Sequence, residues 1–180
     1  RETAEGGRAV AMRADVTSER DLVQMVERCM EEFGRIDILD YNVGISLAGG
    51  DGKLPEVTEE AFDRVMAVNL RGNIMACKHV VPIMIEQGGG TIVNTASGAG
   101  LIATPFLSPY CASKHAVGAI TKGMRLDLNG TGVKVSTVDP GLVNTEFSKV
   151  RFHGDEAKAD KTYQGMTPLV GADVASVVRW

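Results

Sequence analysis

The chain has 180 residues, of which 44% are hydrophobic and 23% charged, so it is long and apolar enough for one globular domain with a core. The formal net charge of -4 at pH 7 and the scattered Arg and Lys residues argue against nucleic-acid binding. The apolar runs are too short to span a membrane. Cys29, Cys77 and Cys111 form neither a disulfide framework nor a zinc motif, and they suit a reducing cytoplasm.

Hydrophobic periodicity predicts strands that alternate with helices. Strands are expected at 8–16, 36–39, 91–96 and 133–138. Helices are expected before Gly34, over 58–87 with Gly72 as a candidate kink, and over 110–129. This alternation implies parallel crossover units and therefore an α/β fold with an open, doubly wound parallel sheet.

Polar residues and glycines follow each predicted strand. Asp15 ends the first strand, Asn42 to Gly44 follow the second, Ser97 the third, and Pro140 with Gly141 the fourth. Ligands of such sheets bind beyond the carboxyl ends of the strands, so these residues are expected to meet at one edge.

A tyrosine and a lysine stand four positions apart in the predicted helix after residue 108. On a helix, Tyr110 and Lys114 share a face, and the Lys114 ammonium could favour the ionised phenol. An acid/base pair is one interpretation of this spacing. An ordinary helix start followed by a solvated lysine is the other.

The segment SGAGLIA at 97–103 imitates a dinucleotide fingerprint with Gly98, Gly100 and Ala103. A true fingerprint opens a helix at once, whereas Pro105 and Pro109 keep this chain in a loop. We interpret the segment as a glycine-rich turn.

Four segments together resemble the short-chain dehydrogenase/reductase family in order and spacing. They are AVNLRG at 67–72, TIVNTAS at 91–97, YCASK at 110–114 and VDPGLVNT at 138–145. The resemblance implies a Rossmann-like sheet. It also implies hydride transfer between NADP or NAD, with NADP favoured, and a secondary alcohol or carbonyl of a small-molecule substrate.

The resemblance places the family's catalytic tetrad on Asn69, Ser97, Tyr110 and Lys114. Tyr110 would exchange a proton with the substrate oxygen, and Ser97 would hydrogen-bond that oxygen. Lys114 would lower the pKa of the phenol and bind the nicotinamide ribose. Asn69 would hold a water that connects Lys114 with solvent.

The resemblance also implies which residues bind the nucleotide. They are Asp15, Val16, Asn42, Gly44, Tyr110, Lys114, Pro140, Gly141 and Thr145. Asp15 would contact the adenine edge, and Thr145 the carboxamide of the nicotinamide.

The sequence departs from the family pattern around the second predicted strand. Tyr41 replaces an Asn, Val43 replaces an Ala, and Asp40 stands where the strand normally carries an apolar residue. A carboxylate at that place needs a partner, a position near the strand end or a raised pKa. Asp139 also replaces a more usual Asn.

The family begins with a strand, a glycine-rich phosphate loop with its helix, and a second strand, and this sequence starts after them. Residues 1–180 are therefore interpreted as a single incomplete NAD(P)-binding domain, lacking the N-terminal phosphate-binding βαβ unit. A completed chain is expected to form a homodimer or homotetramer through the helices at 58–87 and 108–129.

Segment 145–169 resembles the substrate loop of NADP-dependent 3-hydroxy acid dehydrogenases, which include serine and allo-threonine dehydrogenases. Lys149 or Arg151 could meet a substrate carboxylate, or either could be a solvated charge. Two other functions stay open, a 3-oxoacyl chain reductase and an inactive fold remnant that acts as a binding or subunit-pairing module. His79, His115 and His153 have no ligand spacing, so no metal is implied.

Overall fold

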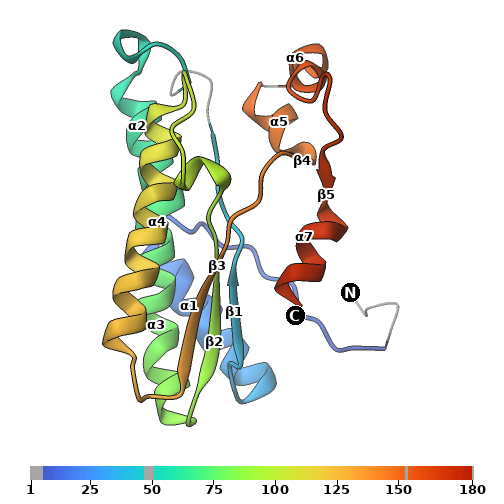
Figure 1. Cartoon of the computed structure of the whole chain (residues 1–180). Coiled ribbons are helices and arrows are strands. Elements are labelled where there is room, and N and C mark those ends of the chain that lie inside the picture. The colour runs from blue at the N-terminus through green and yellow to red at the C-terminus, as the bar shows by residue number, and fades with distance from the viewer. Residues whose placement is uncertain (1–5, 47–50, 153, 180) are drawn as a thin grey trace.

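The computed structural model describes residues 6–46, 51–152 and 154–179. Its centre is a parallel sheet in which β1 (Ile38–Tyr41), β2 (Gly90–Thr95) and β3 (Val133–Val138) lie side by side in chain order (Figure 1). Ile38 pairs with Thr91, and Gly90 pairs with Val133. Three of the four predicted strands are therefore confirmed, although β1 begins two residues later than predicted.

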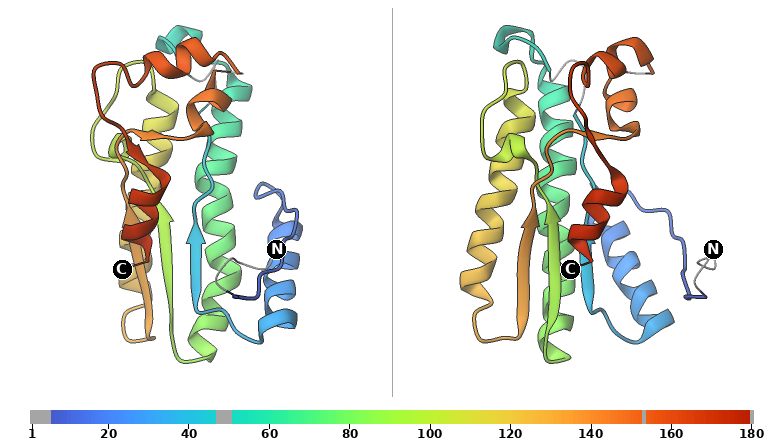
Figure 2. Two further views of the ribbon diagram at one scale, coloured as in Figure 1. Left: turned by 90° about the vertical axis from the view of Figure 1, so that its right-hand side faces the viewer. Right: turned by 45° about the vertical axis from the view of Figure 1, so that its right-hand side comes forward.

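Helices α1 (Glu19–Phe33), α3 (Gly72–Glu86) and α4 (Ser108–Asp127) follow the sequence signals that predicted them. Ser18 caps the start of α1 through its side chain, and Gly34 ends that helix in the left-handed conformation at φ 73°. Helix α1 packs against α3, and both α3 and α4 pack against the sheet. Figure 2 shows α3 and α4 together on one side of the strands.

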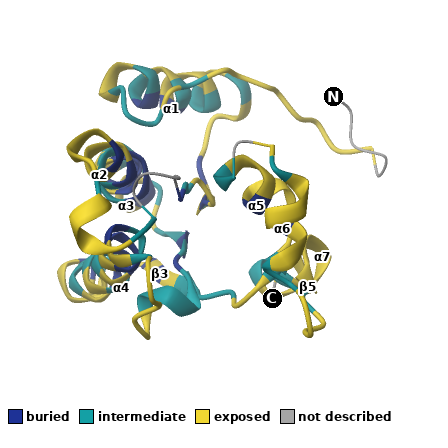
Figure 3. Ribbon diagram, turned by 90° about the horizontal axis from the view of Figure 1, so that it is seen from above, coloured by how far each residue is buried: buried dark blue, intermediate teal, exposed yellow. Residues whose placement is uncertain are grey.

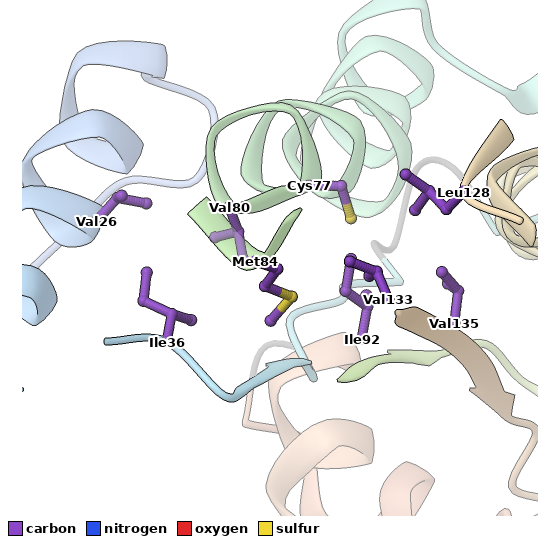
Figure 4. Packing of buried hydrophobic residues seen from close by; sticks show 9 residues of the cluster. All are labelled: Val26, Ile36, Cys77, Val80, Met84, Ile92, Leu128, Val133 and Val135. Atoms are coloured by element: carbon purple, nitrogen blue, oxygen red, sulfur yellow. The ribbon is translucent and has the colours of Figure 1, made fainter. Parts of the chain in front are cut away.

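The core lies between these helices and the sheet (Figure 4). It consists of Val26, Ile36, Cys77, Val80, Met84, Ile92, Leu128, Val133 and Val135. Alternate residues of the buried strands face the helices, and most of the folding free energy is expected to come from burial of this apolar surface.

The predicted helix 58–87 is interrupted before the predicted kink. Helix α2 (Glu59–Met66) begins at the Thr58 cap and passes into a π-helical turn, η2 (Ala67–Arg71), before α3 starts at Gly72. The Tyr41 hydroxyl on β1 donates a hydrogen bond to the Val68 carbonyl in this turn, at 2.9 Å. Single π turns inside helices are frequent at functional sites, and this one contains Asn69.

The predicted strand at 8–16 is wrong. Residues 7–15 belong to no strand and no helix, and Val16 lies in a turn. The Arg8 side chain contacts the carboxylate and the carbonyl of Glu32 on α1 instead. A strand needs a neighbour for its backbone groups, and no strand of the described residues lies beside this segment.

The part after β3 contains short elements that the sequence did not predict. They are β4 (Val143–Asn144), α5 (Glu146–Arg151), α6 (Glu156–Lys161), β5 (Leu169–Val170) and α7 (Gly171–Val178). Strands β4 and β5 pair in parallel, and α7 contacts β3. Figures 1 and 3 show these elements across the sheet from α3 and α4. Within the described ranges, the structure contains no helix with the length and hydrophobicity that a membrane crossing needs.

Gly72 allows the N-terminus of α3 to approach β1 closely. A Cβ at this position would lie 2.5 Å from the Tyr41 hydroxyl oxygen and 2.7 Å from the Val16 carbonyl oxygen. We predict that Gly72→Ala lowers the free energy of unfolding by about 1 to 3 kcal/mol, the usual cost of overpacking. Urea denaturation followed by circular dichroism measures the effect.

Gly123→Ala in α4 is the matched control, because a Cβ there meets nothing within 4 Å. Since Ala is the better helix former by roughly 1 kcal/mol, this variant should unfold at a higher urea concentration. An equal response of the two variants would contradict the close approach at Gly72.

Candidate active site

A cavity of about 700 Å³ opens beyond the carboxyl ends of the three strands. Figure 3 views the molecule from this end. The structure brings eight predicted site residues to its wall: Asn42, Gly44, Ser97, Tyr110, Lys114, Pro140, Gly141 and Thr145. They come from strand ends, from α4 and from the segment after β3, as expected for an open parallel sheet.

Asp15, Val16 and Asn69 do not line this cavity. The exposed Asp15 carboxylate accepts hydrogen bonds from the Thr17 amide and hydroxyl at 2.9 and 2.7 Å, and these bonds lower its pKa. Val16 packs beside Leu22 and Tyr41. The predicted adenine contact of Asp15 is thus not part of the cavity that contains Tyr110.

Lys114 is buried within α4, with 4% of its surface exposed. Its ammonium donates a hydrogen bond to the Thr95 carbonyl at the end of β2, at 2.8 Å. Burial lowers the pKa of Lys114 to about 8, and the charge of Asp139 acts in the opposite direction. A Cβ at Gly44 would lie 3.1 Å from Nζ, so a side chain at this position would crowd the ammonium.

Tyr110 lies next to Lys114, whose Nζ is 5.9 Å from the centre of the phenol ring. The expected lowering of the tyrosine pKa is not found, because burial raises the pKa of Tyr110 and outweighs a hydrogen bond from Ser97 that lowers it. The Ser97 hydroxyl oxygen also accepts a hydrogen bond from the Ala99 amide at 3.1 Å. The phenol therefore holds its proton more firmly than a free tyrosine does.

Asn69 lies in the π-helical turn behind the cavity wall and is fully buried. Its amide oxygen accepts a hydrogen bond from the Ile45 amide, and its amide nitrogen donates to the Ile45 carbonyl and the Ser113 hydroxyl. Among the residues that the structure describes, these bonds use three of its four hydrogen-bonding positions and leave one acceptor position on the oxygen. A Cβ at Gly44 would lie 3.6 Å from the Asn69 amide oxygen and 3.1 Å from the Lys114 ammonium, so the missing side chain leaves a space beside both groups.

Ser113 was not predicted as a site residue. It is completely buried, and its hydroxyl donates to the Tyr110 carbonyl at 2.7 Å while it accepts from Asn69. It therefore connects the π-helical turn with the start of α4. Its position one residue before Lys114 gives no sign of this, since most helical serines are solvated or bond only to their own helix.

The glycine-rich segment after β2 forms a turn, as predicted. Gly98–Gly100 is a short 3₁₀ helix, and no α-helix begins until Ser108. The Gly98 amide donates to the Pro140 carbonyl at 2.8 Å, which joins the loops after β2 and β3.

Asp40 is an exposed residue of β1 that lines the cavity, where its carboxyl is partly shielded from solvent. Burial raises the pKa of its carboxyl, which is one of the outcomes expected for an acidic residue in a strand. Its place one residue before the end of β1 also keeps it near the open edge of the sheet.

Two charged residues of α5 differ sharply in their surroundings. Lys149 is half-exposed and pairs with Glu156 at 2.9 Å. The Arg151 side chain is only 18% exposed, lines the cavity and pairs with Asp51 at 2.6 Å. Sequence reasoning missed Asp51, because the two partners are 100 residues apart and no local pattern joins them.

The histidines take part in ordinary contacts. His79 Nε2 is 2.8 Å from a Glu19 carboxylate oxygen, and His115 Nδ1 is 2.9 Å from the Cys111 carbonyl oxygen. His153 lies outside the described residues. The part of the chain that the structure describes contains no cluster of three His, Cys, Asp or Glu residues that could hold a metal ion.

Known proteins resemble this chain over most of its length. It is 40% identical to 2-(R)-hydroxypropyl-CoM dehydrogenase of Xanthobacter autotrophicus over 151 residues. This matched region covers 84% of the chain and 60% of the other protein. The chain is 34% identical to an NADP-dependent 3-hydroxy acid dehydrogenase of Schizosaccharomyces pombe over 167 residues. This matched region covers 93% of the chain and 64% of the other protein. The chain thus spans less than two thirds of the length of these curated relatives.

A solved structure, the closed form of serine dehydrogenase complexed with NADP+, matches with a TM-score of 0.89 at 35% identity. The match covers 94% of this chain and 68% of the other. It confirms the predicted α/β fold of Rossmann type with a parallel sheet. The family model described as short chain dehydrogenase matches residues 1–156. The chain therefore belongs to the short-chain dehydrogenase family.

Proposed function

We propose that this chain carries the catalytic part of an NAD(P)-dependent oxidoreductase that interconverts a secondary alcohol and a carbonyl. The observation that carries the proposal is the convergence of Ser97, Tyr110 and Lys114 on one cavity at the carboxyl edge of a parallel sheet. Family membership supports the reaction class. The substrate we propose is a small 3-hydroxy or 3-oxo acid, as in the name of the fission-yeast relative.

The residues at the cavity fit the nicotinamide end of a dinucleotide. The buried Lys114 ammonium has one hydrogen-bond acceptor among the described residues, the Thr95 carbonyl, which leaves two donors for ribose hydroxyls. The absence of a side chain at Gly44 leaves the space beside Nζ open, and Thr145 lies on the wall of the same cavity. We propose NADP, with NAD as the alternative, because the names of two similar proteins include NADP.

When bound, the nicotinamide supplies or receives the hydride, and the chain's own residues handle the proton. In the direction of reduction, the Tyr110 phenol gives its proton to the carbonyl oxygen, and Ser97 stabilises the charge that develops there by a hydrogen bond. A phenol whose pKa is raised by burial is a protonated acid at neutral pH. Lys114, with a pKa of about 8, can return a proton to the phenol and recover one from solvent.

Asn69 acts behind this proton path. Its remaining acceptor position can hold a water beside the Lys114 ammonium, because the place that a Gly44 Cβ would take lies 3.6 Å from the Asn69 amide oxygen and 3.1 Å from Nζ. The π-helical turn fixes the amide there, so Asn69 serves as a positioning residue in this proposal.

We also propose that the full-length protein associates through α2, α3 and α4. Phe62 on α2 and Ile74 on α3 are exposed apolar residues near a shallow groove at Met66, Leu70 and Met75. Light scattering of the full-length protein should give the mass of a dimer or tetramer, and Phe62→Glu should lower it. A monomeric wild type would contradict the proposal.

Tyr110→Phe tests the assigned proton donor in the full-length protein. The variant keeps the ring contact with Phe147, whose centre is 6.0 Å away, but it lacks the proton that the substrate oxygen must receive. We expect turnover to fall by roughly 100-fold or more, the loss typical of a general acid, while nucleotide affinity changes little. Steady-state kinetics and a nucleotide titration measure the two quantities. Near-normal turnover would remove Tyr110 from the mechanism and place the proton donor at another residue.

Lys114→Met tests the cost of burying the ammonium. A lysine with a native pKa of about 8 disfavours the folded state by about 3 kcal/mol below pH 8, and this cost disappears as pH rises towards the unfolded value of 10.5. The unfolded chain binds more protons across that interval, so wild-type stability rises with pH. After losing the bond to Thr95, Lys114→Met should still be more stable than wild type by about 2 kcal/mol at pH 7.

Urea denaturation at pH 7 and pH 10 measures this difference. The gap between Lys114→Met and wild type should close at the higher pH, whereas Lys122→Met on the exposed side of α4 should show no such change. The burial cost assigned to Lys114 would be contradicted if the difference in unfolding free energy between the two proteins did not depend on pH. It would also be contradicted if Lys114→Met were less stable than wild type at pH 7.

A further inference from the structure

Among the residues that the structure describes, Arg151 and Asp51 form the least exposed ion pair, and Arg151 lines the cavity. The side chains are 18% and 10% exposed, and Nε of Arg151 lies 2.6 Å from Oδ2 of Asp51. Arg151 is the last residue of α5, and Asp51 belongs to the segment after β1. A buried charge pair seldom adds net stability, so its presence beside the proposed reacting groups calls for a functional reason.

The guanidinium is held on one edge and one face. Its Nε donates to Asp51, and the Phe152 ring lies 4.9 Å from Cζ. No hydrogen bond of Nη1 or Nη2 is found among the residues that the structure describes, although Arg151 lines the cavity. These two nitrogens carry N–H groups arranged to meet both oxygens of a carboxylate at once.

Both carboxylate oxygens of Asp51 have hydrogen-bond partners. The Ser46 hydroxyl lies 3.0 and 2.9 Å from its two carboxylate oxygens, and Arg151 occupies Oδ2. Burial raises the pKa of Asp51, and the Arg151 charge and the Ser46 bond oppose this rise. Asp51 thus turns the guanidinium towards the cavity and balances its charge when no substrate is bound.

The pair is close to the proposed proton donor. Arg151 lines the same cavity as Tyr110, and the charges of Arg151 and Asp51 shift the pKa of the phenol in opposite directions. A substrate whose oxygen is at Tyr110 and whose carboxylate is at Arg151 must therefore fit within this one cavity of about 700 Å³. Lys149, the other cation of α5, is absent from the cavity wall and pairs with Glu156.

We propose that Arg151 binds the carboxylate of a short hydroxy or oxo acid through Nη1 and Nη2, and that Asp51 is the positioning residue that orients it. The inference rests on the proposed function and adds to it the group that selects acids over neutral alcohols. The buried, pre-oriented guanidinium gives its hydrogen bonds more weight than the same contacts have at a surface. The substrate class is thus set by α5 and by the segment after β1.

The test compares 3-hydroxybutanoate with its methyl ester in the full-length protein, with NADP+ as oxidant. The measured quantity is the ratio of the two kcat/KM values, acid over ester. Arg151→Met should lower this ratio by about 100-fold, in line with loss of charge-assisted hydrogen bonds. Arg151→Lys should lower it by about tenfold, because an ammonium is a point charge without the two-pronged geometry.

Asp51→Asn separates orientation from charge. It leaves the Arg151 cation in place, so KM for the acid should rise about tenfold while kcat changes less than threefold, the signature of weakened ground-state binding. Lys149→Met is the matched control on the same helix and should leave the ratio unchanged. Thermal unfolding checks that each variant folds. If Arg151→Met does not fold, the acid-over-ester ratio of Arg151→Lys is the test of the inference.

An equal loss for acid and ester in Arg151→Met would mean that the pair only holds α5 in place, and this outcome overturns the inference. A wild-type protein that oxidises the ester as well as the acid also overturns it, while the proposed function stands. Failure of the wild type to oxidise either compound, or any other secondary alcohol of a test panel, with both nucleotides, contradicts the proposed function itself.

Discussion

Burial of the Lys114 ammonium is the constraint around which the cavity is organised. A cation with 4% exposure and, among the described residues, one carbonyl acceptor is costly, so packing of the surrounding structure must hold it in place, with some help from the charge of Asp139. A buried hydrogen bond from Asn73 to Asn94 joins α3 to β2, and a second from Asn94 to Thr121 joins β2 to α4. The place of the ammonium therefore depends on the polar core between the sheet and two helices.

The π-helical turn is the second element that this arrangement requires. In an uninterrupted α-helix over 59–86, the side chains from residue 67 onward would point in other directions around the helix axis. The π-helical turn places the Asn69 amide oxygen 2.8 Å from the Ile45 amide nitrogen. Tyr41 supports the turn from β1 through its bond to Val68. The departure of Tyr41 from the usual family residue thus has a structural role in this chain.

The sequence predicted the parts of the fold that local patterns encode. The β-branched run 91–96 and the capping residues of α1 and α2 act over a few neighbours, and the structure follows them. The local pattern at 8–16 predicted a strand that the structure does not contain, because a strand forms only beside another strand. The raised pKa of Tyr110, the Asn69 contacts and the Asp51 partner of Arg151 depend on residues brought together from distant segments.

The strand order has a consequence for how the chain reaches this state. β1, β2 and β3 are neighbours both in sequence and in space, so the sheet grows through successive crossovers with modest loop closure. The Arg151–Asp51 contact spans 100 residues and joins short elements outside the main core. Contacts of such separation are among the last to form, and elements with little apolar burial open at lower free energy than the core. The cavity wall at α5 should therefore exchange its amide hydrogens sooner than β2 does.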